Sequence, residues 1–281
     1  MGSRYNGQTL GTFGKYGVLS FNGNKMITTS GGGALITEDE DHWREIMMYA
    51  TQYRESYPYY QHEKIGYNYR MSNICAGIGR GQMTVVNDHL AHHKHVQKMY
   101  EELLADVPGV HVHSQPNETC NLNPETQVPV YDSNYWLCTI TIDENVKVKG
   151  QEDAYKTIVT GAVGGAAGVI HAAASAHTDC EPNANVEAMR VALDKAQIEA
   201  RPVWKPMHKQ PVYCRTNEEC RMKNEELPCG AICQTSATSV AYINGVSEAI
   251  FKVGMCLPAG PYVTDDDVKY IVDTIKENII G

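Results

Sequence analysis

Residues 20–37, SFNGNKMITTSGGGALIT, place a single lysine between two turns. An Asn-Gly-Asn turn precedes Lys25, and hydroxyl residues and a triple glycine follow it. A lysine amine becomes a nucleophile when burial or a nearby cation lowers its pKa, and a strand end can project it into a cleft. The glycines follow Lys25, so the stretch is not a P-loop, and short glycine motifs often match by accident. Taken alone, the pattern favours a plain turn with an exposed lysine.

Two short apolar runs flank this turn, at 16–21 and 33–37, and both have the composition of buried strands. A capping box, Thr37-x-x-Glu40, predicts that a helix follows the second run. A tyrosine-rich loop over 53–68 leads to a long helix predicted from about Ser72 to Ala105. Two strands cannot make a stable sheet alone. We therefore expect strands from elsewhere to pair with them.

The second half of the chain contains one well-patterned strand and two amphipathic helices. Residues 135–142 alternate, with Trp136, Cys138, Ile140 and Ile142 on one face, which predicts a half-buried strand. Helices are predicted over 186–197 and after Thr264, whose cap precedes three aspartates that suit the positive end of a helix dipole. The small-residue segment near 145–183 has no clear period and is predicted to be an insertion.

Composition excludes several classes of function. The chain has 281 residues and a net charge of −9, without the basic clusters that bind nucleic acid. No run of about 18 apolar residues predicts a membrane span, and no signal peptide opens the sequence. Its 9 cysteines are an odd, scattered set, most simply reduced thiols. We expect a cytoplasmic protein that binds neither nucleic acid nor membrane.

Five motifs, in order along the chain, resemble the DegT family of pyridoxal-phosphate-dependent nucleotide-sugar aminotransferases. They are SFNGNKMITTSGGGALIT (20–37), GYNYRMSNICAGIGRGQM (66–83), SNYWLCTITID (133–143), IEARPVWKPMHKQPVY (198–213) and MCLPAG (255–260). The resemblance implies an α/β protein of PLP fold type I, the aspartate-aminotransferase type. Residues 1–110 would form the C-terminal part of the large PLP-binding domain, and residues 111–281 a small α+β domain with the insertion.

By this resemblance Lys25 is the catalytic residue, forming a Schiff base with pyridoxal 5′-phosphate and moving protons during transamination. Ser20 matches a serine that binds the cofactor phosphate. Asn68 matches an asparagine that reaches the phosphate of the neighbouring subunit's cofactor, so the resemblance implies a homodimer with shared active sites. A related branch that removes sugar hydroxyls has histidine in place of this lysine, so Lys25 favours amino transfer.

The resemblance also implies the substrates. An amino group, from glutamate, would pass to a nucleotide-linked keto sugar, and the TTSGGG and RPVWKPMH variants resemble enzymes that aminate UDP-linked 4-keto-6-deoxy-N-acetylhexosamines. His208 matches a position near the sugar nucleotide. Arg70 and Arg201 are candidates for its phosphates or for the donor's carboxylate. Each of these three residues could equally have a structural role.

The family needs further groups that these residues do not supply. An aspartate pairs with the pyridinium nitrogen, an aromatic residue stacks on the ring, and a helix N-terminus binds the phosphate. The family carries these before the segment that GSRYNG (2–7) matches. We therefore expect that Met1 is an internal methionine of a longer protein or that the chain is a deliberate fragment with a vector-like Met-Gly-Ser start. A second hypothesis is a catalytically incomplete fragment or partner subunit.

Two constellations suggest metal sites that we do not expect to exist. Cys214, Cys220, Cys229 and Cys233 could bind zinc in an interaction module, the third hypothesis, but no C-x2-C knuckle is present. His89 and His93 have the i,i+4 spacing of a chelating pair, within a cluster that also holds His92 and His95. Lys94 and Lys98 among them favour a solvated helix face. No metal is predicted.

Overall fold

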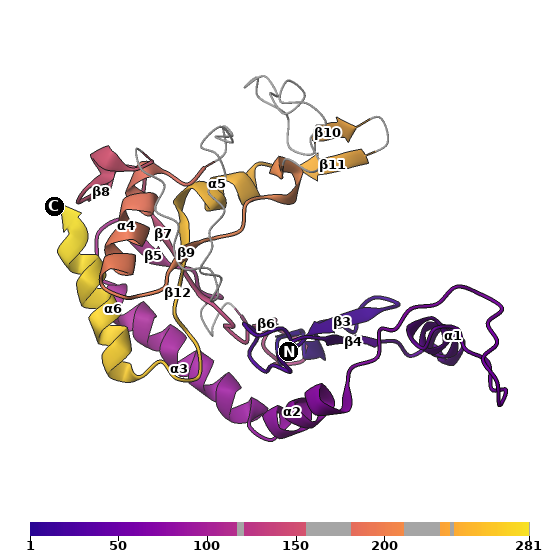
Figure 1. Ribbon diagram of the computed structural model, residues 1–281. Coiled ribbons are helices and arrows are strands. Elements are labelled where there is room, and N and C mark those ends of the chain that lie inside the picture. The colour runs from indigo at the N-terminus through magenta and orange to yellow at the C-terminus, as the bar shows by residue number, and fades with distance from the viewer. Residues whose placement is uncertain (117–120, 156–180, 211–230, 237–238, 281) are drawn as a thin grey trace. The chain divides into compact units, whose positions relative to one another are not determined.

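The computed structural model describes residues 1–116, 121–155, 181–210, 231–236 and 239–280 (Figure 1). The chain forms two compact units. The first comprises Met1–His95, Ser114–Trp136 and Gly260–Tyr262, and the second comprises Val96–His113, Leu137–Ala259 and Val263–Gly281. Both mix helices and strands. The division of the whole protein at about residue 110 stays a prediction, as does the insertion, of which 156–180 lie outside the described residues.

The second unit is built on a four-stranded antiparallel sheet in the order β5 (Val110–Val112), β7 (Cys138–Ile142), β12 (Gly254–Leu257), β9 (Arg201–Pro202). Cys138, Ile140 and Ile142 of β7 are buried, and Thr139 and Thr141 between them are half-buried. The alternation predicted for 135–142 is therefore confirmed, although the strand begins three residues later than expected.

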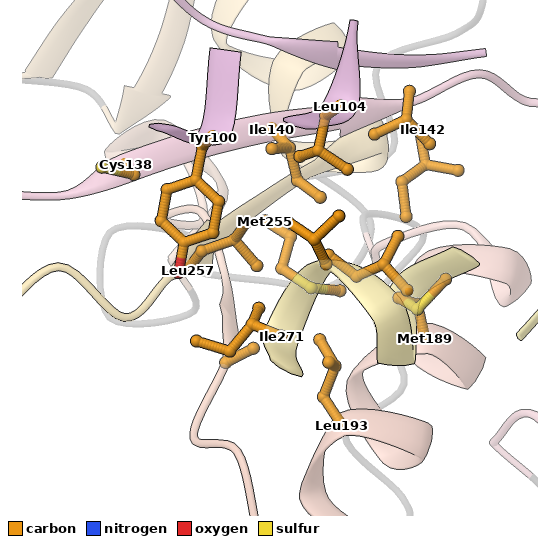
Figure 2. Close-up of a cluster of buried hydrophobic side chains, with 14 of the residues drawn as sticks. Tyr100, Leu104, Cys138, Ile140, Ile142, Met189, Leu193, Met255, Leu257 and Ile271 are labelled. Carbon is orange, nitrogen blue, oxygen red and sulfur yellow. The ribbon is translucent and has the colours of Figure 1, made fainter. Parts of the chain in front are cut away.

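The helices α4 (Ala184–Lys195) and α6 (Asp265–Asn278) pack against each other in this unit. Figure 2 shows how their side chains meet those of the sheet and of the C-terminal half of α3 (Val86–Leu104). Thr264 caps α6 through a capping box with Asp267, because each side chain accepts the other's backbone N–H. Both helices match the predicted amphipathic stretches, and Val268, Ile271, Val272 and Ile275 form the buried apolar face of α6.

Short elements complete the second unit. α5 (Val246–Val253) precedes β12, and β8 (Lys147–Val148) pairs with β13 (Ile279–Ile280). β10 (Ala231–Ser236) and β11 (Ser239–Ile243) form an antiparallel pair, and the 3-10 turns η1 (Gln151–Asp153) and η3 (Met207–Lys209) lie in connections. The described part of the segment after Ile198, residues 199–210, contains Pro202 and Pro206 and forms β9 and η3.

The first unit contains two small sheets. β3 (Gly17–Ser20) and β4 (Gly33–Ile36) are antiparallel partners, so the two strands expected around Lys25 are confirmed. Their expected burial is wrong for this chain: Val18 is 76% and Leu35 is 46% exposed. The second sheet, β2 (Gln8–Thr9), β1 (Arg4–Tyr5), β6 (Tyr131–Asp132), was not expected, since two-residue strands carry too little pattern to be recognised.

Three helices accompany these sheets. α1 (Glu40–Ala50) is capped by Asp39, which accepts the backbone N–H of His42, so the predicted Thr37–Glu40 box is wrong. The predicted long helix is broken into α2 (Asn73–Met83) and α3. The helix α2 ends at Thr84, whose Oγ1 donates to the Gly81 carbonyl at 2.7 Å. Thr84 is the first of three successive β-branched residues, and such a run disfavours a continuous helix.

The helices of the first unit bury little. Neither α1 nor α2 has a buried residue, and the buried apolar side chains among the unit's described residues are Met26, Ile27 and Tyr53. The 53–68 stretch is irregular, as predicted. Among the residues that the structure describes, no helix is both long and apolar enough to cross a membrane.

Candidate active site

Lys25 lies in the connection between β3 and β4, five residues beyond the end of β3 at Ser20. Its backbone N–H donates to the Asn22 carbonyl at 3.0 Å, which closes the predicted turn. The returning chain is held by Thr29, whose N–H donates to the Phe21 carbonyl at 2.9 Å. Lys25 itself is half-buried. The loop therefore has a defined path around the lysine.

The hydroxyls and glycines after Lys25 shape this loop. Thr28 Oγ1 donates to the Phe21 carbonyl and accepts from the N–H of Ser30 at 2.9 Å, while Thr29 Oγ1 donates to the Gly31 carbonyl. A Cβ at Gly33 would lie 2.4 Å from the carbonyl oxygen of Leu19, so only glycine fits the strand pairing there. These groups are occupied by the loop itself, whereas the Ser20 side chain is exposed.

Three side chains from distant parts of the sequence tie alternate residues of the lysine loop. Trp136 donates from Nε1 to the Asn24 carbonyl at 2.9 Å. His89 of α3 bonds through Nδ1 to the Met26 carbonyl at 2.9 Å, and Gln82 of α2 accepts the Thr28 N–H at 3.3 Å. Since a carbonyl can only accept, His89 must carry its proton on Nδ1 in this contact. The backbone on both sides of Lys25 is thus fixed.

Trp136 also contacts the lysine side chain. Lys25 Nζ lies 3.7 Å from the centre of the Trp136 ring, a cation–π contact. Trp136 was expected only as one of the inward-facing residues of a strand, and instead it lies two residues before β7. The signal that could have identified it was a side chain with an aromatic face and an N–H donor next to a polar turn.

The expectation of a solvated histidine face on α3 is wrong for His93, which is only 1% exposed. Burial lowers the pKa of His93 to about 4, and the neighbouring His92 and His89 add to the shift, so its ring is neutral near pH 7. His92 bonds through Nε2 to the Gly260 carbonyl at 3.1 Å. Among the described residues, no three His, Cys, Asp or Glu side chains gather as a metal site. Cys214, Cys220 and Cys229 lie outside them.

Asn68 and Arg70 are exposed. Asn68 forms an antiparallel bridge with Thr51, flanked by hydrogen bonds from the N–H groups of Tyr67 and Tyr69 to the carbonyls of Tyr49 and Ala50. Within the part of the chain that the structure describes, neither Asn68 nor Arg70 forms a hydrogen bond or ion pair with Lys25 or Ser20. The bridge explains why Asn68 is held in place, and its role at a cofactor stays a prediction.

His208 and Arg201 belong to the second unit. His208 lies in η3 and bonds through Nε2 to Glu248 of α5 at 2.8 Å, and Lys209 reaches the same carboxylate oxygen at 3.2 Å. Burial opposes ionisation of Glu248, but the hydrogen bonds from His208 and Lys209 outweigh it and lower its pKa. Glu248 was not predicted as a site residue. Arg201, on β9, pairs with Glu199, and both side chains are largely exposed.

Comparison with known proteins places these features in a family. A profile of the DegT/DnrJ/EryC1/StrS aminotransferase family matches residues 1–162. The chain belongs to this family. A Bacillus subtilis (strain 168) protein, provisionally named pyridoxal phosphate-dependent aminotransferase EpsN, is 31% identical over 275 residues, covering 98% of this chain and 53% of the relative. GDP-perosamine synthase of Escherichia coli O157:H7 is 26% identical over 279 residues, covering 98% and 55%.

Solved structures show the same fold. An aminotransferase of Helicobacter pylori, PseC, involved in the biosynthesis of pseudoaminic acid, matches with a TM-score of 0.64 and 16% identity, over 98% of this chain and 56% of that one. The expected fold class, that of the PLP fold type I aminotransferases, is therefore confirmed. The chain spans about half the length of the curated relatives that it matches.

Proposed function

We propose that the whole protein is a pyridoxal-phosphate-dependent aminotransferase that moves an amino group from glutamate to a nucleotide-linked keto sugar. The observation that carries the proposal is the lysine loop, in which the backbone around Lys25 is tied at Asn24, Met26 and Thr28. A loop that only connects two strands does not need three side chains from distant parts of the sequence. Membership in an aminotransferase family supports the same conclusion.

The residues of the loop fit the cofactor chemically. Pyridoxal phosphate has an aldehyde, which an amine can bind, and a phosphate, which hydroxyl groups can bind. The half-buried amine of Lys25 and the exposed hydroxyl of Ser20 provide one group of each kind. The hydroxyls of Thr28 and Thr29 already donate within the loop. We therefore assign the covalent link to Lys25 and a phosphate contact to Ser20.

When bound, the cofactor supplies an electron sink for charge that develops at the amino-bearing carbon. Lys25 would hold the cofactor through its amine and would take and return a proton through Nζ. The ties to Asn24 and Met26 fix the backbone from which the Lys25 side chain extends. Ser20, exposed at the end of β3, would donate its hydroxyl proton to the phosphate.

The remaining cofactor contacts come from other polypeptide segments. A cofactor ring nitrogen that is to stay protonated needs a carboxylate of its own beside it, separate from the lysine. We propose that this acid belongs to the part of the protein that corresponds to the rest of the relatives' length. Asn68, exposed and held by its bridge to Thr51, would reach the phosphate bound by a second subunit of a homodimer. Without that remaining part, the chain is a catalytically incomplete fragment or partner subunit.

For the sugar nucleotide we propose His208, with Arg70 and Arg201 as candidates for phosphates or for the donor's carboxylate. Glu248 contacts Nε2 of His208, and this contact fixes the orientation of the imidazole ring. The TTSGGG and RPVWKPMH motifs support a UDP-linked 4-keto-6-deoxy-N-acetylhexosamine. The likeness to GDP-perosamine synthase favours a second candidate, a GDP-linked sugar. Binding of UDP and GDP, compared by calorimetry, separates the two candidates.

The proposal is tested by mixing the purified chain with pyridoxal phosphate, reducing with borohydride and mapping the adducts by mass spectrometry. We expect one dominant adduct, on Lys25, which is lost in Lys25→Ala and retained in Lys15→Ala, a change at the exposed lysine before β3. Adducts spread evenly over surface lysines would contradict a preformed lysine site. We expect full aminotransferase activity only when this chain is combined with the segment that corresponds to the unmatched part of the relatives.

A further inference from the structure

Trp136 makes two contacts with the lysine loop from one side chain. Its Nε1 donates to the Asn24 carbonyl at 2.9 Å, and its ring centre lies 3.7 Å from Nζ of Lys25. The first contact fixes the ring relative to the loop backbone. The second places the charged amine against the electron-rich face of the indole, the strongest cation–π partner among the aromatic side chains.

The position of Trp136 is itself well defined. Its backbone N–H donates to Asn134 Oδ1 at 3.1 Å, and Tyr135 adopts a left-handed φ of 44° held by its N–H bond to Ser133 Oγ. Asn134 in turn donates its backbone N–H to Ser3 Oγ at 2.9 Å. This compact turn directs the indole before the chain enters β7. The ring is thus anchored both at its base and at its N–H group.

We propose that Trp136 is a positioning residue for Lys25 that holds the free amine whenever it is not bound to the cofactor. The inference rests on the proposed function, because an amine that is released once in each full catalytic cycle must wait close to the carbon to which it returns. An indole face can hold an ammonium group without forming a hydrogen bond that must be broken, whereas a carboxylate would hold it more strongly. Trp136 therefore keeps Lys25 in place and available.

The first experiment needs no cofactor. The rate of reductive methylation of each lysine, with formaldehyde and cyanoborohydride, is measured by mass spectrometry in the wild type, Trp136→Leu and Trp136→Phe. The reaction consumes the accessible amine, and the indole ring lies against Nζ of Lys25, so its removal should speed the reaction about two- to fivefold at Lys25 in Trp136→Leu. Trp136→Phe keeps a weaker ring and should give a smaller increase. Trp43→Leu, at an exposed tryptophan of α1, is the matched control.

Other lysines report on the integrity of the fold. Lys98 is exposed on α3 and should be modified at the same rate in every variant. If Trp136→Leu speeds all lysines equally, that variant has unfolded, and Trp136→Phe then decides. An unchanged Lys25 rate in a folded variant would overturn the proposal.

The second experiment repeats pyridoxal phosphate capture on the same variants. Trp136→Leu should shift capture from Lys25 toward other lysines, and Trp136→Phe should partly restore selectivity. Selective capture that is identical in the wild type and Trp136→Leu would also overturn the positioning role. If the wild type captures no cofactor while Trp136→Leu still alters methylation of Lys25, the proposed function fails for this chain and the contact between the two side chains stands.

Discussion

His89 Nδ1 lies 2.9 Å from the carbonyl oxygen of Met26, which joins α3 to the residue directly after Lys25. Both partners are at least partly buried, so solvent competes weakly for the bond. The contact connects two parts of the sequence that are 63 residues apart. It makes α3 part of the support of the lysine loop and gives the first prediction.

Replacing His89 by Leu should loosen the lysine loop, because the Met26 carbonyl loses its donor. We expect a loss of about 1 kcal/mol in the free energy of unfolding, measured by urea titration, and weaker selectivity of cofactor capture at Lys25. His89→Asn places an amide N–H near the original Nδ1 and should recover part of both. Equal loss in the two variants would show that ring packing, rather than the hydrogen bond, is what matters.

Substitutions at Gly33 and Gly31 distinguish two roles of the triple glycine, strand pairing and ligand binding. A Cβ at Gly33 would lie 2.4 Å from the Leu19 carbonyl oxygen, whereas one at Gly31 would meet nothing within 4 Å. Gly33→Ala should therefore disrupt the pairing of β3 with β4 and reduce capture at Lys25 severalfold, and Gly31→Ala should leave both unchanged. Amide hydrogen exchange over the two strands is the measurement. Equal sensitivity of the two glycines would instead favour a ligand-binding role for the whole glycine run.

Tyr100 tests the core of the second unit. It is fully buried and donates from its hydroxyl to the Pro258 carbonyl at 2.9 Å, next to β12. Tyr100→Phe should cost about 1–2 kcal/mol of unfolding free energy, since the carbonyl is left buried without its donor. Tyr262→Phe, at a side chain that is 93% exposed, is the matched control and should cost nothing measurable. A neutral Tyr100→Phe would mean that water reaches the carbonyl.

Glu248 predicts a pH dependence of stability in the acid range. Its folded pKa is lowered by the bonds from His208 and Lys209, so it binds fewer protons in the folded than in the unfolded state. Its contribution is therefore complete above the unfolded value, about 4.5, and is lost as pH falls through the lower folded value. Glu248→Gln should show a flatter stability curve below about pH 4.5, by thermal melts. A parallel acid-induced loss in both proteins would contradict the assignment.

The parts of the fold that could be predicted are those where one face is buried within the chain. Cys138, Ile140 and Ile142 alternate because β7 packs on one side, and Val268, Ile271 and Ile275 follow a helical period for the same reason. The burial of His93 was also readable, because His93, Val96 and Tyr100 are spaced three and four residues apart and share a helix face. The neighbouring Lys94 and Lys98 favour a solvated face instead.

The parts that could not be predicted depend on single long-range contacts. Nothing in the residues around Lys25 indicates that Trp136 and His89 bind its flanking carbonyls, because each pairing joins segments more than sixty residues apart. At Thr84 the hydroxyl's hydrogen bond to the Gly81 carbonyl competes with continuation of the helix. Helix propensity alone does not predict which of the two wins. The apolar residues of β3 and β4 predicted buried strands, and the pairing of the two strands is confirmed, but Val18 and Leu35 are exposed.

The small number of buried apolar side chains in the first unit has a thermal consequence. Segments with few buried contacts open locally at a free-energy cost below that of global unfolding. The lysine loop is held by hydrogen bonds and one ring contact, whereas the second unit has a continuous hydrophobic cluster. On heating, the isolated chain should thus lose its selective reactivity at Lys25 several degrees before calorimetry records the main heat-absorption peak, and added cofactor should narrow that interval.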